Sequence, residues 1–269
     1  MKNCCLFLVA ACLACAGCFK NWSRPADVIT VTSLDALENI PPDSAKRAEI
    51  VRLFLRGATR PVKDDDLEGL SDSKLQQLDL SEINGMETVP QKVWSLKGLT
   101  SFWFVRNGLK EIPDQFANLR ALTYLNLDGN SITNVPDSLK DVTKLRWLRL
   151  NGNQIAELPG SLSALKDMRR LYMRQNKLTA VPEVVKEWPE LEDLVLDDNP
   201  GIKSVPDWVG TDLPKLKSLS LKGCPIGQLP ADLSGLRGLS TLNVADCNFS
   251  SEEVERVRKA LGDKVVILF

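Results

Sequence analysis

The chain has 269 residues and a mass of 29.8 kDa, the size of one large domain or two small ones. It is 43% hydrophobic and 26% charged, with a formal net charge of −1, which excludes a fibrous or wholly disordered chain and argues against nucleic-acid binding. Because there is no histidine, Ser-His-Asp and Cys-His catalysis are excluded and the commonest metal ligand is missing. We therefore expect no catalytic residues, no metal and no cofactor.

The first residues have the composition of an export signal. Lys2 precedes a small and apolar run over residues 4–17. This run is shorter than the roughly 20 apolar residues that span a bilayer, and polar residues follow it. We predict a signal peptide over residues 1–17 rather than a membrane-spanning helix.

The end of this segment, Ala16-Gly17-Cys18, resembles the lipobox of bacterial lipoproteins, in which the signal is cut before a cysteine that becomes lipidated. The position three residues before Cys18 is Cys15, where the family usually has leucine. The resemblance implies lipidation of Cys18, with Cys15 and Cys12 as alternatives, and attachment to a membrane through an N-terminal lipid anchor. The competing interpretation is an ordinary signal peptide whose cysteines are small apolar filler. Residues 18–32 are then a tether.

Residues 33–74 lead into the regular part of the chain. Residues 49–56 alternate between apolar and polar, as a strand with one buried face does. We predict a divergent first repeat here, covered by an N-terminal cap over residues 33–48. The alternative is a helix that continues from Ser44.

A unit of about 23 residues repeats across residues 75–249, and leucine, which occurs 42 times in the chain, dominates it. Its clearest copy reads Leu122-Thr-Tyr-Leu125-Asn-Leu127-Asp-Gly-Asn130. The same frame starts at Leu75, Leu99, Leu122, Leu145, Met168, Leu191, Leu216 and Leu239. This pattern resembles the leucine-rich repeat, L-x-x-L-x-L-x-x-N-x-L, in the 23-residue form that also carries x-L-P-x-x-L-x-x-L.

Each recurring position has a physical role. Leu125 and Leu127 belong to a short strand that stacks in parallel with its neighbours. Asn130 and its equivalents can satisfy buried backbone groups where the chain turns inward. Pro136 and its equivalents favour a short helix or 3-10 turn on the return. The predicted fold is α/β: a right-handed leucine-rich repeat solenoid with a parallel concave sheet, short helices or 3-10 turns on the convex side, and a cap at each end.

Two features depart from the repeat. The 25-residue unit at Leu191 contains Asn199-Pro200-Gly201 and Gly210-Thr211, which predict two small bulges. Cys224 and Cys247 stand where other repeats have asparagine, so they should stack in the turn as small buried groups. A disulfide between them is the alternative, because neighbouring strands lie roughly 4.8 Å apart.

The last segment, residues 250–269, is predicted to be a helix-strand cap. Ser250-Ser251-Glu252-Glu253 resembles a capping box. It opens an amphipathic helix that stops at Gly262, and residues 265–269 form a closing strand.

The third, fifth and seventh residues of each repeat are expected to point out from the concave sheet. Both tyrosines of the chain and two of its six tryptophans fall there, with arginines among them. Such residues are enriched at binding hot spots, so we predict a protein-binding site formed by Trp103, Tyr124, Trp147, Arg149, Arg170, Tyr172 and Arg174.

The competing interpretation of the arginines is that they only form surface pairs, Arg170 with Asp193, Arg174 with Asp197 and Arg169 with Glu192. The other three tryptophans within the repeats are assigned by their positions in the repeat unit. Trp94 and Trp208 are expected on the outer surface, and Trp188 in the core.

These features favour a lipid-anchored, extracytoplasmic protein-binding module, and the chain resembles the leucine-rich repeat lipoproteins of bacteria. The resemblance implies the bacterial cell envelope, and Phe19, where inner-membrane lipoproteins often have Asp, favours the outer membrane. An inhibitor or scaffold of a partner enzyme is the alternative, and an enzyme is the least favoured. The identity of the partner and the oligomeric state are left open.

Overall fold

The structure is a computed structural model that describes residues 28–269. The predicted signal peptide, the lipidation candidates Cys12, Cys15 and Cys18, and the first part of the tether lie outside the described residues. No helix within residues 28–269 has the length and apolar character needed to cross a membrane.

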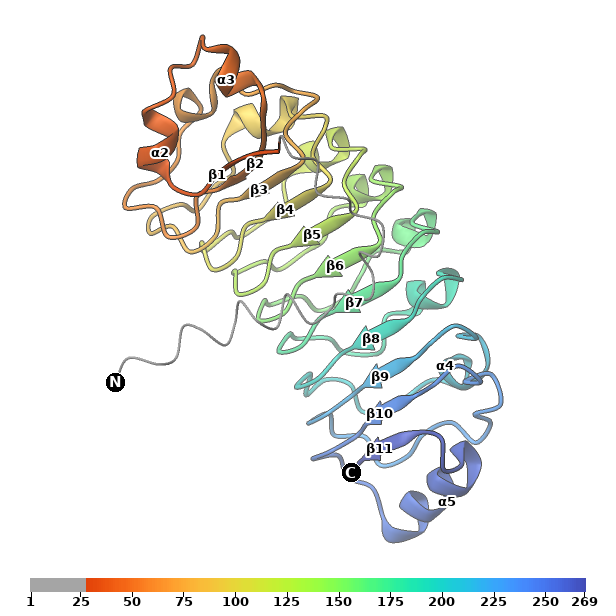
Figure 1. Ribbon diagram of the computed structural model, residues 1–269. Helices are drawn as coiled ribbons and strands as arrows, with labels where there is room; N and C mark the ends of the chain where they lie inside the picture. Colours follow the sequence, from red (N-terminus) through yellow and green to blue (C-terminus); the bar gives the residue numbers. More distant parts are fainter. Residues whose placement is uncertain (1–27) are drawn as a thin grey trace.

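Parallel strands stack in chain order into one open, curved sheet of 11 strands (Figure 1). The strands are β1 (Ile29–Val31), β2 (Ile50–Phe54), β3 (Gln77–Asp79), β4 (Ser101–Trp103), β5 (Tyr124–Asn126), β6 (Trp147–Arg149), β7 (Arg170–Tyr172), β8 (Asp193–Val195), β9 (Ser218–Ser220), β10 (Thr241–Asn243) and β11 (Val266–Leu268). From β2 to β11 the register advances by one repeat without a shift. The predicted solenoid is confirmed.

The convex side is built from short 3-10 turns. They are η2 (Gln91–Ser95), η3 (Asp114–Asn118), η4 (Asp137–Asp141), η5 (Gly160–Ala164) and η6 (Glu183–Glu187), and a proline precedes each. Proline lacks an N–H and has its φ already set, so it suits the start of a helical turn. The longer repeat at Leu191 instead carries a turn of α-helix, α4 (Trp208–Thr211), where a bulge at Gly210-Thr211 was predicted.

The predicted asparagine ladder is present in the turns that follow the strands. The Asn153 side chain accepts a hydrogen bond from the N–H of Ile132 at 3.0 Å. It donates to the carbonyls of Leu127 at 3.1 Å and Leu150 at 3.0 Å. The same arrangement recurs at Asn107, Asn130, Asn176 and Asn199. Each amide thus ties its own repeat to the preceding one.

Cys224 and Cys247 continue the ladder as free thiols. Each Sγ lies 3.3 Å from a carbonyl of the preceding repeat, so the thiol replaces the amide as a donor. A thiol is a poor acceptor, so the backbone N–H groups that an asparagine oxygen would accept from bond to backbone carbonyls instead. The N–H of Ile202 bonds to the carbonyl of Asn199, and that of Ile226 bonds to the carbonyl of Cys224.

The N-terminal cap begins earlier than predicted. Residues 29–31, assigned to the tether, form β1 and pair with β2. Two short helices, α2 (Leu34–Glu38) and α3 (Ala45–Ala48), lie between these strands. A helix does start at Ser44, whose hydroxyl caps it, but it ends before β2, so residues 50–54 are the strand of the divergent first repeat. A further turn, η1 (Asp65–Leu67), follows.

The C-terminal cap is helix α5 (Ser251–Leu261) followed by β11, as predicted. Only half of the capping box forms. The Ser250 hydroxyl accepts from the N–H of Glu253 at 3.2 Å, but the Glu253 carboxylate accepts from the N–H of Leu229 instead. The helix ends at Gly262, whose φ of +71° suits a residue without a side chain.

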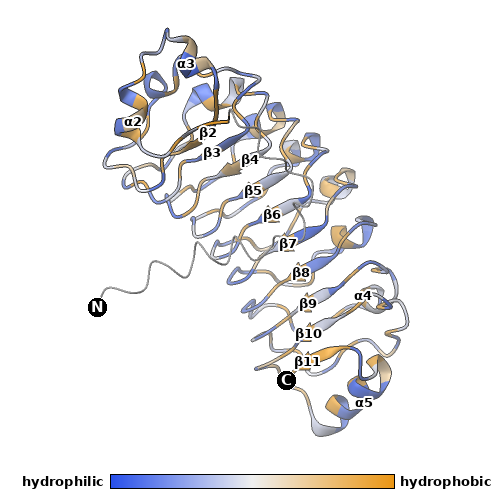
Figure 2. Cartoon of the chain, viewed as in Figure 1, coloured by the Kyte–Doolittle hydropathy of each residue, from blue (hydrophilic) through white to orange (hydrophobic). Residues whose placement is uncertain are grey.

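One continuous apolar core fills the space between sheet and turns, and Figure 2 shows hydrophobic residues distributed along the whole solenoid. Trp188 lies in it, as predicted, and its Nε1–H donates to the carbonyl of Leu162 at 2.9 Å. The prediction that Trp94 lies on the outer surface was wrong. Its ring is buried, because the next repeat places Phe116 beside it at a centroid distance of 5.0 Å, and the two rings pack edge to face.

Candidate protein-binding face

The three-residue strands present their first and third side chains on the concave face and their middle side chain to the core. In β5, Leu125 is buried while Tyr124 is half-buried on the face. Because the strands are in register, Tyr124 lies beside Trp147, which lies beside Arg170. Residues that are 23 positions apart in the sequence are thus neighbours on the face.

Five aromatic side chains on this face form an unbroken row. The aromatic row consists of Phe54, Trp103, Tyr124, Trp147 and Tyr172. Successive ring centroids are 6.3, 5.0, 4.9 and 5.9 Å apart, all within the range of favourable aromatic contact. The row crosses strands β2 to β7, so it runs across the sheet rather than along one strand.

Two arginines stack on the C-terminal half of the row. The guanidinium of Arg170 lies over the Trp147 ring at 4.8 Å from its centroid, and that of Arg149 lies over Tyr172 at 5.3 Å. Each arginine lies on the strand next to its ring. Cation–π contact of this kind stabilises a partly buried arginine, and it holds both planar groups in place.

The same two arginines are also paired with carboxylates. Arg149 Nη2 lies 2.7 Å from Asp128 Oδ2, and Arg170 Nε lies 3.0 Å from Asp193 Oδ2. Burial nevertheless raises the pKa of the Asp193 carboxyl, against the effect of Arg170. At neutral pH these two positive and two negative charges cancel, so the centre of the face is electrically balanced.

The tyrosine hydroxyls keep their protons. Burial raises the pKa of Tyr172 to about 12, helped by the nearby Asp193, whose carboxylate accepts from the Tyr172 hydroxyl at 3.3 Å. Burial also raises the pKa of Tyr124, which accepts from the Asn126 amide at 3.4 Å. Beside them, the buried Nε1–H of Trp147 has no hydrogen-bond partner within the described part of the chain. The centre of the face is therefore aromatic, with balanced charges and polar groups at the edges of the rings.

Six of the seven predicted site residues come together, and Arg174 does not. Arg174 is exposed and pairs with Asp198 at 3.0 Å, away from the rings. The predicted pairing with Asp197 was wrong, because the Asp197 carboxylate accepts instead from the Ser220 hydroxyl and the N–H of Lys222, both in the next repeat. The predicted pairs of Arg170 with Asp193 and of Arg169 with Glu192 are present.

Sequence reasoning missed two members of the site, Phe54 and Asp128. Phe54 is in register with Asp79, and Asp79 is in register with Trp103, so Phe54 and Trp103 occupy equivalent positions on the concave face. The sequence does contain this information, because residues 49–56 alternate like the strand of a repeat and place Phe54 at the position that Trp103 occupies in its own repeat. Asp128 was placed on the face, but its role as the partner of Arg149 was not recognised.

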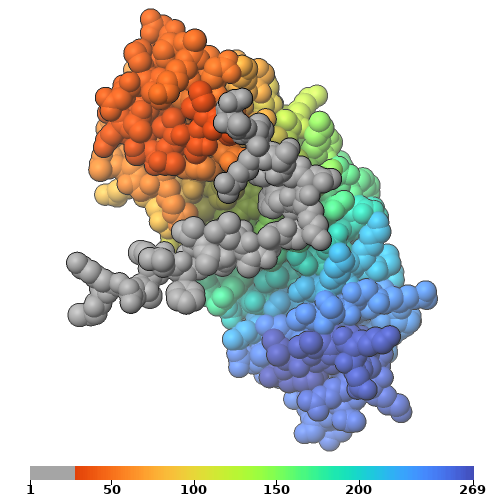
Figure 3. Space-filling model, viewed as in Figure 1, coloured from red at the N-terminus to blue at the C-terminus, as the bar shows by residue number. Residues whose placement is uncertain are grey.

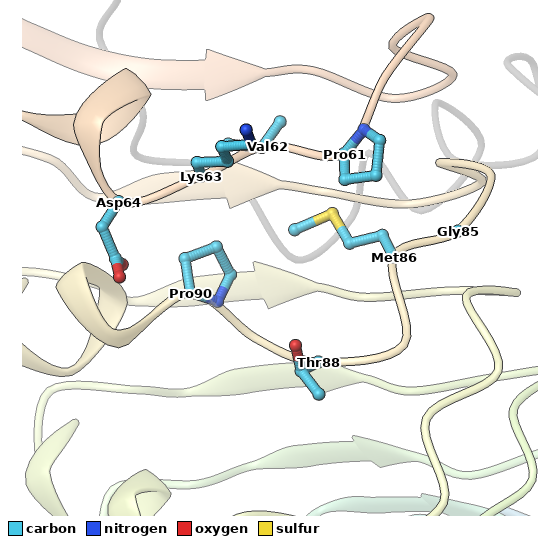
Figure 4. A pocket seen from close by; sticks show the side chains of 8 residues that line it. All are labelled: Pro61, Val62, Lys63, Asp64, Gly85, Met86, Thr88 and Pro90. Carbon is cyan, nitrogen blue, oxygen red and sulfur yellow. The ribbon is translucent and has the colours of Figure 1, made fainter.

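Other hollows offer less chemistry. A pocket of about 280 Å³ lies between the loop at Pro61–Asp64 and that at Gly85–Pro90 (Figure 4). Its carboxylate, Asp64, already accepts from the N–H of Lys92 at 2.7 Å. Within residues 28–269, no group of three or more histidine, cysteine or acidic side chains is placed to hold a metal ion.

Comparison with known proteins identifies the repeats. A leucine rich repeat family model matches residues 97–155, and a second leucine rich repeat model matches residues 215–236. No curated protein matches the sequence.

Many solved structures share the fold. A leucine-rich repeat protein of Leptospira interrogans is 23% identical, with a TM-score of 0.50, over 85% of this chain and 74% of that one. An internalin of Listeria monocytogenes is 20% identical, with a TM-score of 0.67, over 89% of this chain and 71% of that one. The ectodomain of a plant membrane receptor kinase of Arabidopsis thaliana, in complex with Casparian strip integrity factor 2, is 23% identical, with a TM-score of 0.59. The match covers 75% of this chain and 24% of the receptor chain.

Proposed function

We propose that this leucine-rich repeat protein is a non-enzymatic binding module that holds a protein partner on the aromatic row of its concave face. The single observation that carries the proposal is the unbroken contact of five rings on the side of the sheet that faces away from the core. Concave faces of repeat solenoids are extended binding surfaces, and the similar plant receptor kinase ectodomain was solved in complex with Casparian strip integrity factor 2.

Stability alone is a poor explanation for the row. The core is already filled by the middle residues of the strands, such as Leu125 and Leu148, which are completely buried. The rings lie on the opposite side of the sheet, so they do not help to fill that core. Tyrosine, tryptophan and arginine combine large rigid contact area with polar edges, which is the composition of binding hot spots.

We further propose that the protein is exported and held at the bacterial envelope by a lipid on Cys18, facing a partner outside the cytoplasm. This part rests on the sequence of residues 1–18, and its test is the intact mass of the protein recovered from membranes of its own host. We expect a chain that begins at Cys18 with added acyl mass. A chain that begins at Met1, or a soluble chain that begins after Cys18, would contradict it.

The binding proposal is tested by capture with matched variants. Trp103→Ser with Tyr124→Ser removes the second and third rings of the row and so interrupts it. Trp208→Ser is the control, because Trp208 is also half-buried but lies in α4, on the convex side. Proteins cross-linked to the immobilised wild type in envelope extracts should also be captured by the control and lost with the double variant. Equal capture by all three proteins would refute the proposal.

A further inference from the structure

The exposed large hydrophobic side chains of the described residues gather at one end of the sheet. They are Val266, Leu268 and Phe269, with exposed fractions of 60%, 47% and 37%. Figure 2 shows β11 as a hydrophobic strand, and in Figure 3 the C-terminal residues form part of the molecular surface. Val266 and Leu268 are in register with Thr241 and Asn243, so they extend the concave face.

The outer edge of β11 has no neighbouring strand within the described residues. On its inner side, the N–H of Val266 donates to Ser240 and the carbonyl of Leu268 accepts from Val244. Successive residues of a strand direct their backbone groups to opposite sides. The N–H and carbonyl of Ile267 therefore point outward, away from β10.

This edge lacks the usual protection against pairing. Natural edge strands carry charges, proline or bulges, whereas β11 reads Val-Ile-Leu and pairs regularly with β10. The segment that precedes β11 contacts the residue that follows this strand: Arg258 of α5 lies over the Phe269 ring at 5.2 Å from its centroid, and the Phe249 ring lies 6.2 Å from the same ring. The helix is also held by the convex side. Arg256 of α5 donates to the carbonyls of Leu229 and Pro230, at 3.0 and 3.2 Å, which ties the helix to the start of the convex return.

We propose that β11 pairs antiparallel with β11 of a second copy, about a two-fold axis at Ile267. On this axis Ile267 lies opposite Ile267 of the second copy, and the outward N–H of each residue donates to the outward carbonyl of the other. Val266 then lies opposite Leu268 of the second copy on the concave face, so each apolar side chain meets an apolar one. The strand is complementary to itself in backbone and in side chains, which a two-fold interface requires.

A head-to-tail arrangement is less favourable. Pairing β11 with β1 of another molecule would add copies until a ring closed or a filament formed, whereas the two-fold pairing is complete with two copies because it occupies the β11 edge of both. The dimer joins two sheets into one continuous sheet with two concave faces side by side. This inference is independent of the proposed function, because the aromatic row and β11 are separate surfaces.

The test is the mass of the full chain by sedimentation equilibrium in a density-matched detergent. We expect the wild type to show twice the monomer mass, decreasing on dilution. Val266→Lys with Leu268→Lys places lysine opposite lysine in both cross-strand pairs and should give the monomer. Val266→Lys with Leu268→Glu removes the same apolar surface but places opposite charges across the axis, and should dimerise more strongly than the double lysine variant.

Several outcomes would overturn the proposal. They are a wild type that is monomeric at every concentration, a double lysine variant that dimerises like the wild type, or a lysine–glutamate variant as monomeric as the double lysine one. Thermal melting of all three proteins identifies any variant that fails to fold.

A second measurement is independent of charge. Val266 and Leu268 of the second copy form a non-hydrogen-bonded pair, with Cα atoms about 4.5 Å apart. A mixture of Val266→Cys and Leu268→Cys chains should therefore form a disulfide between those positions under mild oxidation, identified from the mass of the linked peptides. Neither variant alone should do so, since each new thiol then faces an unchanged residue. Linkage in both single variants, or none in the mixture, would overturn the register.

Discussion

Replacing Asn153 with alanine tests whether the asparagine ladder holds the repeats together. Asn153 is buried in the middle of the solenoid and bonds to the N–H of Ile132 and to the carbonyls of Leu127 and Leu150. Both carbonyls keep a second partner, because the carbonyl of Leu127 also accepts from Asn130 and that of Leu150 from Asn176. A longer contact of 3.3 Å joins the Asn153 amide to the carbonyl of Asn151, which already accepts from the N–H of Gly129. The N–H of Ile132 loses its acceptor.

The expected loss follows from this inventory. A buried N–H without a partner costs about 1–3 kcal/mol, and each lost bond to a carbonyl that keeps another partner costs about 0.5–1 kcal/mol. Asn153→Ala should therefore lower the free energy of unfolding by about 2–5 kcal/mol, which corresponds to a decrease in Tm of roughly 10 °C for a domain of this size. Asn153→Cys should cost less than alanine, because Cys224 shows that a thiol at this position still donates to a carbonyl.

Urea unfolding followed by circular dichroism measures the loss, and Asn134→Ala is the matched control. Asn134 is exposed, and its amide bonds only to the neighbouring Thr133 hydroxyl, so its replacement should change stability by less than about 0.5 kcal/mol. If Asn153→Ala were within about 1 kcal/mol of this control, the ladder would not be a source of stability and the reasoning would be refuted.

Three further predictions concern single side chains. The pKa of Tyr172 is about 12 in the folded chain against an ordinary value of 10.0, so the hydroxyl stabilises the fold below pH 10 and this contribution is lost as the pH rises towards 12. In urea titrations between pH 10 and pH 12, Tyr172→Phe should therefore lose less stability than the wild type. Burial raises the pKa of the Cys247 thiol from 9.0 to about 11, so iodoacetamide at pH 8 should alkylate it about 100-fold more slowly in the folded chain than in urea, and equal rates would contradict its burial. Gly235→Ala places a Cβ atom 2.2 Å from the Thr211 carbonyl oxygen and should lower the free energy of unfolding by about 1–3 kcal/mol. Gly160→Ala is the control, because its Cβ atom would have no other atom within 4 Å and should not destabilise the fold. Equal melting temperatures of the two variants would contradict the close packing at Gly235.

The architecture could be predicted because one physical pattern is repeated many times. Each strand, turn and proline is specified by local sequence, and stacking then follows from the shared register. Leu125 and its equivalents identified the core, and Tyr124 and its equivalents identified the face. Trp94 was misplaced because its position in the repeat faces outward in an average unit, and a bulky ring next to Phe116 changes the local packing.

The contacts within the site could be predicted only where they join direct neighbours in register. Arg170 and Asp193 are such neighbours, and their pairing was correct. Arg174 pairs with Asp198, one residue further along the chain, because the Asp197 carboxylate is bonded to Ser220 and Lys222 of the next repeat. Arg149 and Tyr172 are also neighbours in register, but their stacking was not foreseen, because the direction of the Arg149 side chain depends on Asp128 as well.

The contacts within the face also bear on how it would bind. A side chain that is ordered only on binding costs about 0.5–1.5 kcal/mol of affinity. Here Trp147 is held between two tyrosines and beneath Arg170, and Arg149 is held by Asp128 and Tyr172. These groups are ordered before a partner arrives, so little of that cost is left. Because their charges are already balanced, selectivity on this face would depend on shape and on aromatic contact more than on net charge.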